Sequence, residues 1–217
     1  MKFKLAVFDL DGTLVDSLED IGDAMNRVLT ERGYPTHPYD SYRFFVGNGI
    51  RNLVLQSLPE TASDTDEVDR CFNEMIADYG RNYINKTHLY DGIAPLLDEL
   101  TKRGVKKAIL SNKADDITQK VCSELLSGWQ FEAVMGASKL FPRKPDPSSA
   151  LHIAAAVNVS PSSVIYIGDS DVDMQTARAA MFTAVGATWG FRSRLELINA
   201  GAMYTIDKPT DLLALLD

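Results

Sequence analysis

Three features are scarce in this sequence: long apolar runs, cysteines and an excess of basic residues. No uninterrupted apolar run approaches the roughly 18 residues that a membrane-spanning helix needs, so we expect no bilayer span. The two cysteines, Cys71 and Cys122, provide no disulfide framework and fit a reducing cytoplasm. The 22 basic and 30 acidic residues give a formal charge of −8, which argues against a nucleic-acid groove. An acidic chain that binds an anion must do so with a local cation.

Short apolar runs alternate with amphipathic helical patterns along most of the 217 residues. Residues 5–8, 108–110 and 164–167 are continuous apolar runs, as expected for strands that are covered on both faces. Strands separated by helices are typical of a parallel sheet with helical crossovers. We therefore predict an α/β fold with a Rossmann-like parallel sheet.

Residues 16–88 break this alternation. Leu18, Ile21 and Met25 follow helical spacing, and no convincing strand run appears in this segment. Further helices are predicted over residues 39–46, 50–57 and 65–86. The simplest account is an all-helical domain at 16–88, inserted into a core made of residues 1–15 and 89–217.

Polar side chains follow each of the three apolar runs. Asp9 and Asp11 come after the first, Ser111 and Asn112 after the second, and Asp169 after the third. In open parallel sheets ligands bind beyond the carboxyl ends of the strands, so we expect these residues to meet at one edge. Clustered carboxylates repel one another, and a hard cation with oxygen ligands is the usual remedy. Asp9, Asp11 and Asp169 therefore suit Mg²⁺.

Two further segments offer groups that bind phosphate. Lys144 is followed by Pro145 and, two residues later, by Pro147; these prolines restrict the backbone around one lysine. Lys144 is therefore the candidate local cation. Gly47-Asn48-Gly49 lies between predicted helices, where its backbone would allow close approach of a ligand.

Together these motifs resemble the haloacid dehalogenase superfamily of phosphohydrolases, in order and along the whole chain. Residues 9–17 match the first motif of that family, Ser111-Asn112-Lys113 the second, Lys144-Pro145 the third, and Gly168-Asp169 with Asp173 the fourth. A helical insertion after the first motif is similar to the cap domain of one subgroup. Val46-Gly47-Asn48-Gly49 and Trp189-Gly190-Phe191 look most like phosphoglycolate phosphatases. One departure is Ala180-Met181, where relatives usually carry Gly before the next strand.

The resemblance implies a role for each motif residue. Asp9 is the nucleophile that forms an aspartyl-phosphate, and Asp11 is the general acid and base. Ser111 and the Asn112 N–H bind phosphoryl oxygens, Lys144 offsets charge, and Asp173 orients Lys144 or the metal shell. The metal, Mg²⁺, is held by Asp9, the Asp11 carbonyl oxygen and Asp169. Gly47, Asn48 and Gly49 are the implied substrate contacts in the cap.

These motifs predict a cytoplasmic Mg²⁺-dependent phosphatase, a monomer or homodimer, acting on a small phosphate monoester such as 2-phosphoglycolate. A β-phosphoglucomutase-like mutase, a pyrophosphatase or a nucleotidase would use the same core residues and stays open. A phosphonatase needs a cap lysine that forms a Schiff base, and Lys86 is a poor candidate. Outside enzymes, the alternatives are a non-catalytic phosphate-binding protein and a phospho-acceptor signalling protein. We expect neither a nucleic-acid nor a membrane partner.

Overall fold

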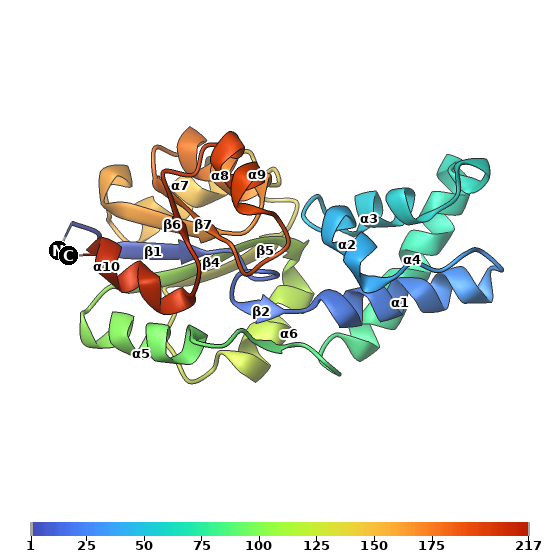
Figure 1. Cartoon of the computed structure of the whole chain (residues 1–217), viewed down its shortest axis with the longest axis horizontal. Coiled ribbons are helices and arrows are strands. Elements are labelled where there is room, and N and C mark those ends of the chain that lie inside the picture. Colours follow the sequence, from blue (N-terminus) through green and yellow to red (C-terminus); the bar gives the residue numbers. More distant parts are fainter. Residues whose placement is uncertain (1, 217) are drawn as a thin grey trace. The chain divides into compact units, whose positions relative to one another are not determined.

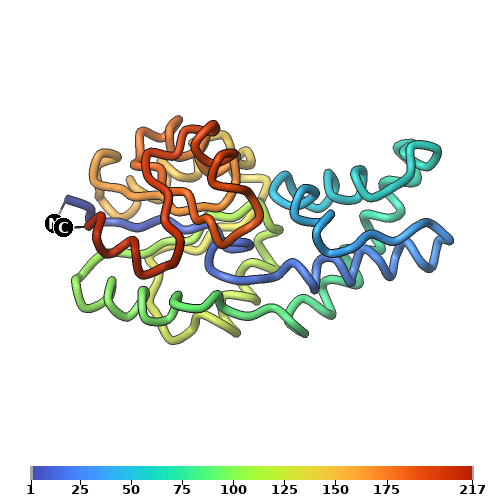
Figure 2. Tube along the Cα trace, viewed as in Figure 1, coloured from blue at the N-terminus to red at the C-terminus, as the bar shows by residue number. Residues whose placement is uncertain are grey.

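The computed structural model describes residues 2–216, and the chain divides into two compact units. One unit contains the chain up to Asp16 and from Leu89 onward, and the other contains residues 17–88 (Figure 1). Figure 2 shows residues 17–88 as one continuous stretch of the trace, so the smaller unit is a single insertion. The chain passes between the units at strands β2 (Val15–Asp16) and β3 (His88–Leu89), which form a two-stranded sheet.

A six-stranded sheet forms the centre of the larger unit, with strand order β5-β4-β1-β6-β7-β8. All of its neighbouring strands are parallel. The strands are β1 (Leu5–Phe8), β4 (Lys106–Ala114), β5 (Ala133–Ala137), β6 (Val164–Gly168), β7 (Thr183–Ala187) and β8 (Tyr204–Ile206). The predicted Rossmann-like parallel core is confirmed.

Helices cover both faces of this sheet, with α7, α8 and α9 on one side and α5 and α6 on the other (Figure 1). The helices of this unit are α5 (Ile93–Lys102), α6 (Asp115–Leu125), α7 (Ser148–Ala156), α8 (Asp171–Ala179), α9 (Arg194–Ala200) and α10 (Leu213–Leu216). Leu5 and Val7 of β1 pack with Ile153 of α7 and Met174 of α8 in one buried cluster. All four residues of β1 are buried, which explains its uninterrupted apolar sequence.

The register of the three central strands aligns their carboxyl ends. Phe8 of β1 pairs with Ile109 of β4 and with Ile167 of β6. Strand β4 continues beyond the predicted 108–110 through Ser111, Asn112 and Lys113, with a register shift between Leu110 and Ala114. The prediction that these polar residues follow the strand is therefore wrong. They are buried within it, because the end of β4 lines the polar site instead of turning into solvent.

The regular elements of residues 17–88 are helical, apart from His88 in β3. They are α1 (Leu18–Glu31), α2 (Tyr39–Phe45), α3 (Ile50–Ser57), a short 3₁₀ turn (Glu60–Ala62) and α4 (Thr65–Asn82). Their core contains the fully buried side chains of Met25, Tyr42, Met75 and Tyr79. Arg32, following α1, donates to Glu67 and Glu74 of α4, which joins the end of α1 to α4.

Cys71 and Cys122 are both free and buried. Among residues 2–216, no helix combines the length and the apolar character that crossing a membrane requires. The location in the cytoplasm stays a prediction.

Candidate active site

The carboxyl end of β1 lies at the centre of the sheet, between β4 and β6. Asp9 is the first residue after β1, and its backbone N–H donates to the carbonyl oxygen of Ile167 at 2.9 Å. Its own carboxylate oxygen Oδ1 accepts from the N–H of Leu10 at 2.7 Å, which fixes the side chain locally. The sequence thus places a buried carboxylate where the chain leaves β1 between its two neighbouring strands, the usual ligand position in such sheets.

Lys144 reaches Asp9 from the segment before α7. Its Nζ lies 3.0 Å from Oδ1 of Asp9 and 2.7 Å from Oδ1 of Asp173, and its side chain is 2% exposed. Burial alone would lower the pKa of the Lys144 ammonium, but the carboxylates of Asp173 and Asp9 outweigh it and hold the pKa well above its ordinary value. The structure therefore brings the predicted local cation into contact with the predicted nucleophile.

Asn112 braces Lys144 through two hydrogen bonds. The Lys144 N–H donates to Oδ1 of Asn112 at 2.9 Å, and Nδ2 of Asn112 donates to the Lys144 carbonyl oxygen at 3.1 Å. This pair of bonds joins the end of β4 to the segment that carries Lys144. A structural task for the Asn112 side chain was not predicted, while the predicted phosphate contact of its N–H stays a prediction.

Asp169 follows β6 and is held by two donors. The Thr13 hydroxyl donates to Oδ1 at 3.1 Å, and the N–H of Phe191 donates to Oδ2 at 2.8 Å. Burial and repulsion from Asp173 raise the pKa of Asp169 to about 7, against these two hydrogen bonds. Burial and then Asp173 also raise the pKa of Asp9 well above its ordinary value, against the Lys144 ammonium.

Two glycines approach Asp169 so closely that no side chain fits. A Cβ atom at Gly12, whose φ is +80°, would lie 2.2 Å from Oδ2 of Asp169. A Cβ atom at Gly190 would lie 2.3 Å from the Asp169 Cβ. Gly12 belongs to the loop after β1 and Gly190 to the loop after β7, so both loops close around the same carboxylate.

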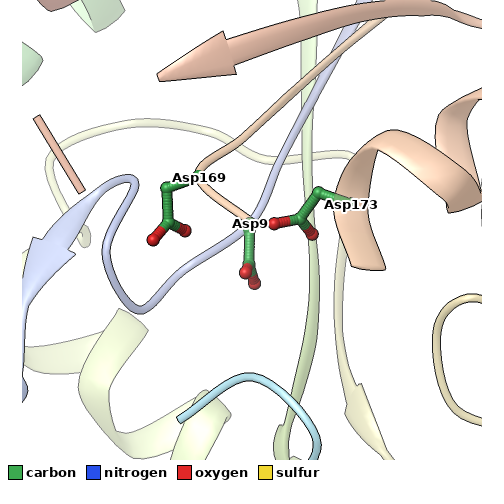
Figure 3. A group of neighbouring side chains, drawn as sticks. All are labelled: Asp9, Asp169 and Asp173. Atoms are coloured by element: carbon green, nitrogen blue, oxygen red, sulfur yellow. The ribbon is translucent and has the colours of Figure 1, made fainter. Parts of the chain in front are cut away.

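Figure 3 shows Asp9, Asp169 and Asp173 as neighbours, with Asp9 drawn between the other two. One carboxylate oxygen of each lies within 4.8 Å of the others. Oxygen donors at this spacing suit a hard divalent cation, which would also offset the repulsion that raises the pKa values of Asp9 and Asp169. The donor set of the site therefore fits a bound metal ion.

Both oxygens of Asp173 are engaged by neighbouring donors. Oδ1 accepts from Lys144, and Oδ2 accepts from the hydroxyl of Ser170 at 2.6 Å and from its N–H at 3.1 Å. Ser170 and Asp173 together form a capping box at the start of α8. Asp173 is therefore fixed by the helix and contacts the lysine, while its role toward Lys144 or the metal shell stays a prediction.

Asp11 and Ser111 meet through a residue to which the sequence assigned no role. Nζ of Lys113 lies 2.6 Å from Oδ1 of Asp11, and the N–H of Lys113 donates to Oγ of Ser111 at 3.2 Å. Burial raises the pKa of the Cys122 thiol on α6 to about 12, and the Asp11 carboxylate adds to that effect. The spacing of Ser111 and Lys113 on one strand was visible in the sequence, whereas the pairing with Asp11 is a tertiary contact.

Gly47, Asn48 and Gly49 form the connection between α2 and α3 in the smaller unit. Gly47 and Gly49 have φ values of 121° and 84°, which favour glycine, and Gly49 precedes the first residue of α3. Their predicted contact with substrate stays a prediction.

Comparison with known proteins identifies the family. The family model described as haloacid dehalogenase-like hydrolase matches residues 6–187. The chain therefore belongs to the haloacid dehalogenase-like hydrolases, and the predicted superfamily is confirmed.

Individual relatives lie among the phosphatases of this family. The phosphoglycolate phosphatase of Pseudomonas putida is 32% identical over 216 residues, covering 98% of this chain and 78% of the relative. That of Psychrobacter arcticus is 32% identical over 228 residues, covering 100% and 96%. A solved haloacid dehalogenase-like family hydrolase from Streptococcus pneumoniae has a TM-score of 0.90 at 26% identity, covering 100% and 99%. The predicted similarity to phosphoglycolate phosphatases is confirmed. The predicted enzyme class, phosphoric monoester hydrolase, is also confirmed.

Proposed function

We propose that this protein hydrolyses small phosphate monoesters through an aspartyl-phosphate on Asp9, with 2-phosphoglycolate as the preferred substrate. The observation that carries the proposal is the buried contact between Asp9 and Lys144, at 3.0 Å, beside the carboxylate of Asp169. A buried anionic nucleophile next to a fixed cation suits attack on an anionic phosphate. The names of the two relatives support the choice of substrate.

In the first half-reaction a carboxylate oxygen of Asp9 forms a bond to phosphorus, and the bond from phosphorus to the ester oxygen breaks. Asp11 donates a proton to the departing alkoxide. The Lys144 ammonium, the Ser111 hydroxyl and the Asn112 N–H bind the phosphoryl oxygens, where negative charge accumulates. The alcohol leaves, and the phosphoryl group stays on Asp9.

In the second half-reaction Asp11 accepts a proton from a water molecule, and the water oxygen attacks phosphorus. The bond between phosphorus and the Asp9 oxygen breaks, which releases inorganic phosphate and restores the carboxylate. Asp9, Asp169 and the carbonyl oxygen of Asp11 are the proposed Mg²⁺ ligands, and Mg²⁺ supplies positive charge that offsets the phosphate and the carboxylates.

Residues 17–88 are proposed to act as the cap that recognises the leaving group. Gly47, Asn48 and Gly49 are the positions to test, because they connect α2 and α3 and the positive φ at Gly47 and Gly49 favours glycine over residues with a side chain. The cytoplasmic location and the small-molecule substrate belong to the same proposal.

The open alternatives within the family differ in substrate and not in the core residues. A phosphonatase is disfavoured by Lys86, whose Nζ lies 2.9 Å from Asp23 and 3.1 Å from Glu19. Hydrogen bonds that the Lys86 ammonium donates to Asp23, to the Tyr39 hydroxyl and to Glu19 raise the pKa of Lys86 above its ordinary value. An ammonium held in this way is unsuited to forming a Schiff base, which requires the neutral amine.

Phosphate release from a panel of substrates tests the proposal. The panel contains 2-phosphoglycolate, pyrophosphate, nucleoside monophosphates, β-glucose 1-phosphate and other sugar phosphates, each with Mg²⁺ and with EDTA, and Asp9→Asn is the control. We expect the highest kcat/KM for 2-phosphoglycolate, lost with EDTA and in Asp9→Asn. Preference for another ester would overturn the choice of substrate, and equal rates for the wild type and Asp9→Asn would overturn the phosphatase itself.

A further inference from the structure

Lys113 is a buried lysine whose two ends reach two different residues of the site. Its Nζ lies 2.6 Å from Oδ1 of Asp11, and its backbone N–H donates to Oγ of Ser111 at 3.2 Å. The side chain of Lys113 is 4% exposed and that of Asp11 is 11% exposed. One residue is thus in contact with both the proposed acid and base and a proposed phosphate ligand.

The contact with Lys113 constrains the orientation of the Asp11 carboxylate. A buried ammonium is costly unless a charged partner lies close to it, and a separation of 2.6 Å is short for such a charge-assisted hydrogen bond. Removing one partner leaves the other charged and buried, so the two side chains hold each other in place.

The backbone of Lys113 is itself held tightly. A Cβ atom at Gly136 on β5 would lie 2.7 Å from the Lys113 carbonyl oxygen, so the two strands approach as closely as glycine allows. The hydroxyl of Thr118 on α6 donates to the same oxygen at 3.3 Å. The position from which the Lys113 side chain starts is therefore determined by β5 and α6.

We infer that Lys113 is a positioning residue, which acts through Asp11 and Ser111 and does not itself contact substrate. Its ammonium orients the Asp11 carboxylate for proton exchange with the leaving group and with water. Its backbone N–H donates to the Ser111 hydroxyl oxygen. The hydroxyl hydrogen therefore points away from Lys113 and toward a phosphoryl oxygen. The inference rests on the proposed phosphatase function.

Two substrates separate this role from a purely structural one. The alkoxide that leaves 2-phosphoglycolate needs a proton from Asp11, whereas p-nitrophenolate is stable enough to leave without one. Misplacing Asp11 therefore slows both half-reactions with 2-phosphoglycolate. With p-nitrophenyl phosphate it slows only the second, so the first turnover still releases p-nitrophenol at the normal rate.

The test measures Lys113→Met against Lys107→Met. Lys107 is a second buried lysine on β4, but its Nζ donates to the Thr101 hydroxyl at 2.8 Å, away from the site. We expect Lys113→Met to lower kcat for 2-phosphoglycolate roughly 100-fold, the cost of misplacing a catalytic group by about 1 Å. KM and the first-turnover release of p-nitrophenol should stay close to the wild type. Lys107→Met should keep the wild-type kcat for 2-phosphoglycolate and the wild-type first-turnover release of p-nitrophenol.

A double-mutant cycle with Asp11→Asn completes the test. If Lys113 acts through Asp11, Lys113→Met adds little to the loss already caused by Asp11→Asn. If circular dichroism shows that Lys113→Met does not fold, Lys113→Arg replaces it, because this variant keeps the charge. Its first turnover must then be slower with 2-phosphoglycolate and unchanged with p-nitrophenyl phosphate.

Three outcomes would overturn the inference. Lys113→Met could have the same rates as Lys107→Met, or it could slow the first turnover equally with both substrates. In the double mutant, the rate losses of Lys113→Met and Asp11→Asn could multiply. Each of them requires an active wild type, so they remain distinct from failure of the proposed function. That failure would instead appear as a wild type no faster than Asp9→Asn.

Discussion

Nζ of Lys144 lies 3.0 Å from Oδ1 of Asp9, and both side chains are almost completely buried. The pair joins the end of the central strand to the segment before α7, and Asp173 holds the lysine from its other side at 2.7 Å. Such an arrangement keeps the proposed nucleophile and a cation fixed before any substrate arrives. Fixed charges of this kind need no rearrangement during the reaction, which is how electrostatic catalysis lowers a barrier.

Replacing the lysine of this pair should affect both activity and stability. Lys144→Met leaves Asp9 and Asp173 without their shared cation, so we expect kcat to fall at least about 100-fold. Loss of one partner from a buried pair should also lower the free energy of unfolding by about 3 kcal/mol. Phosphate release and urea unfolding measure the two effects, with the exposed Lys139→Met as control. Activity within threefold of the control would contradict the role of Lys144.

Gly12 and Gly104 offer a matched pair of substitutions. Both have positive φ, 80° and 68°, but only at Gly12 would an added Cβ atom have neighbours within 4 Å, namely the atoms of Asp169. Gly104→Ala should therefore cost only backbone strain, about 1 kcal/mol of stability, and keep its activity. Gly12→Ala should in addition displace Asp169 and raise the Mg²⁺ concentration needed for half-maximal activity. Equal Mg²⁺ dependence of the two variants would contradict the close packing around Asp169.

Asp169→Asn should have opposite effects with and without metal. In the metal-free protein the change removes one of three crowded negative charges and keeps a partner for Phe191 N–H and for the Thr13 hydroxyl, so the melting temperature should rise. Mg²⁺ at 100 times its Kd should stabilise the wild type by about 2.7 kcal/mol and the variant much less. Thermal melts with EDTA and with Mg²⁺ measure both effects. A variant stabilised by Mg²⁺ as much as the wild type would remove Asp169 from the metal site.

Met181 is predicted to be a strained position. It follows α8 with a φ of 59° and is 73% exposed. Left-handed backbone costs a non-glycine residue about 1–2 kcal/mol, partly offset by the greater chain entropy of glycine when unfolded. Met181→Gly should therefore raise the free energy of unfolding by about 0.5 kcal/mol. Asn158→Gly, at a φ of 55°, should raise the free energy of unfolding by less, because Asn tolerates this conformation. An equal increase in the two variants would show that backbone strain at Met181 is not the cause.

Two of the three central strands were predictable because they are apolar throughout. Strands β1 and β6 are buried along their whole length and stand out in the sequence. Strand β5 (Ala133–Ala137) is only partly buried and contains Gly136, while β8 (Tyr204–Ile206) is a three-residue edge strand. Short or half-exposed strands carry little apolar signal, and this is why the sequence did not predict them.

The site was predictable to the extent that strand ends determine it. Asp9, Asp11, Ser111 and Asp169 follow from strand direction and from the motifs. The residues that hold these side chains do not follow from the sequence in this way. They make contacts between distant segments: Thr13 and Phe191 with Asp169, Asn112 with Lys144, and Lys113 with Asp11. Such contacts depend on side-chain packing in the folded chain, which spacing along the sequence does not encode.

Chemical trapping of the intermediate is the decisive test of nucleophilic attack by Asp9. Asp11→Asn is mixed with p-nitrophenyl phosphate and Mg²⁺, because this leaving group needs no proton and the variant hydrolyses the intermediate slowly. Acid quenching followed by borohydride reduction converts an aspartyl-phosphate to homoserine, which mass spectrometry of peptides locates. We predict homoserine at position 9, dependent on substrate and on Mg²⁺. Homoserine at another aspartate, or none despite a burst of p-nitrophenol, would contradict the account.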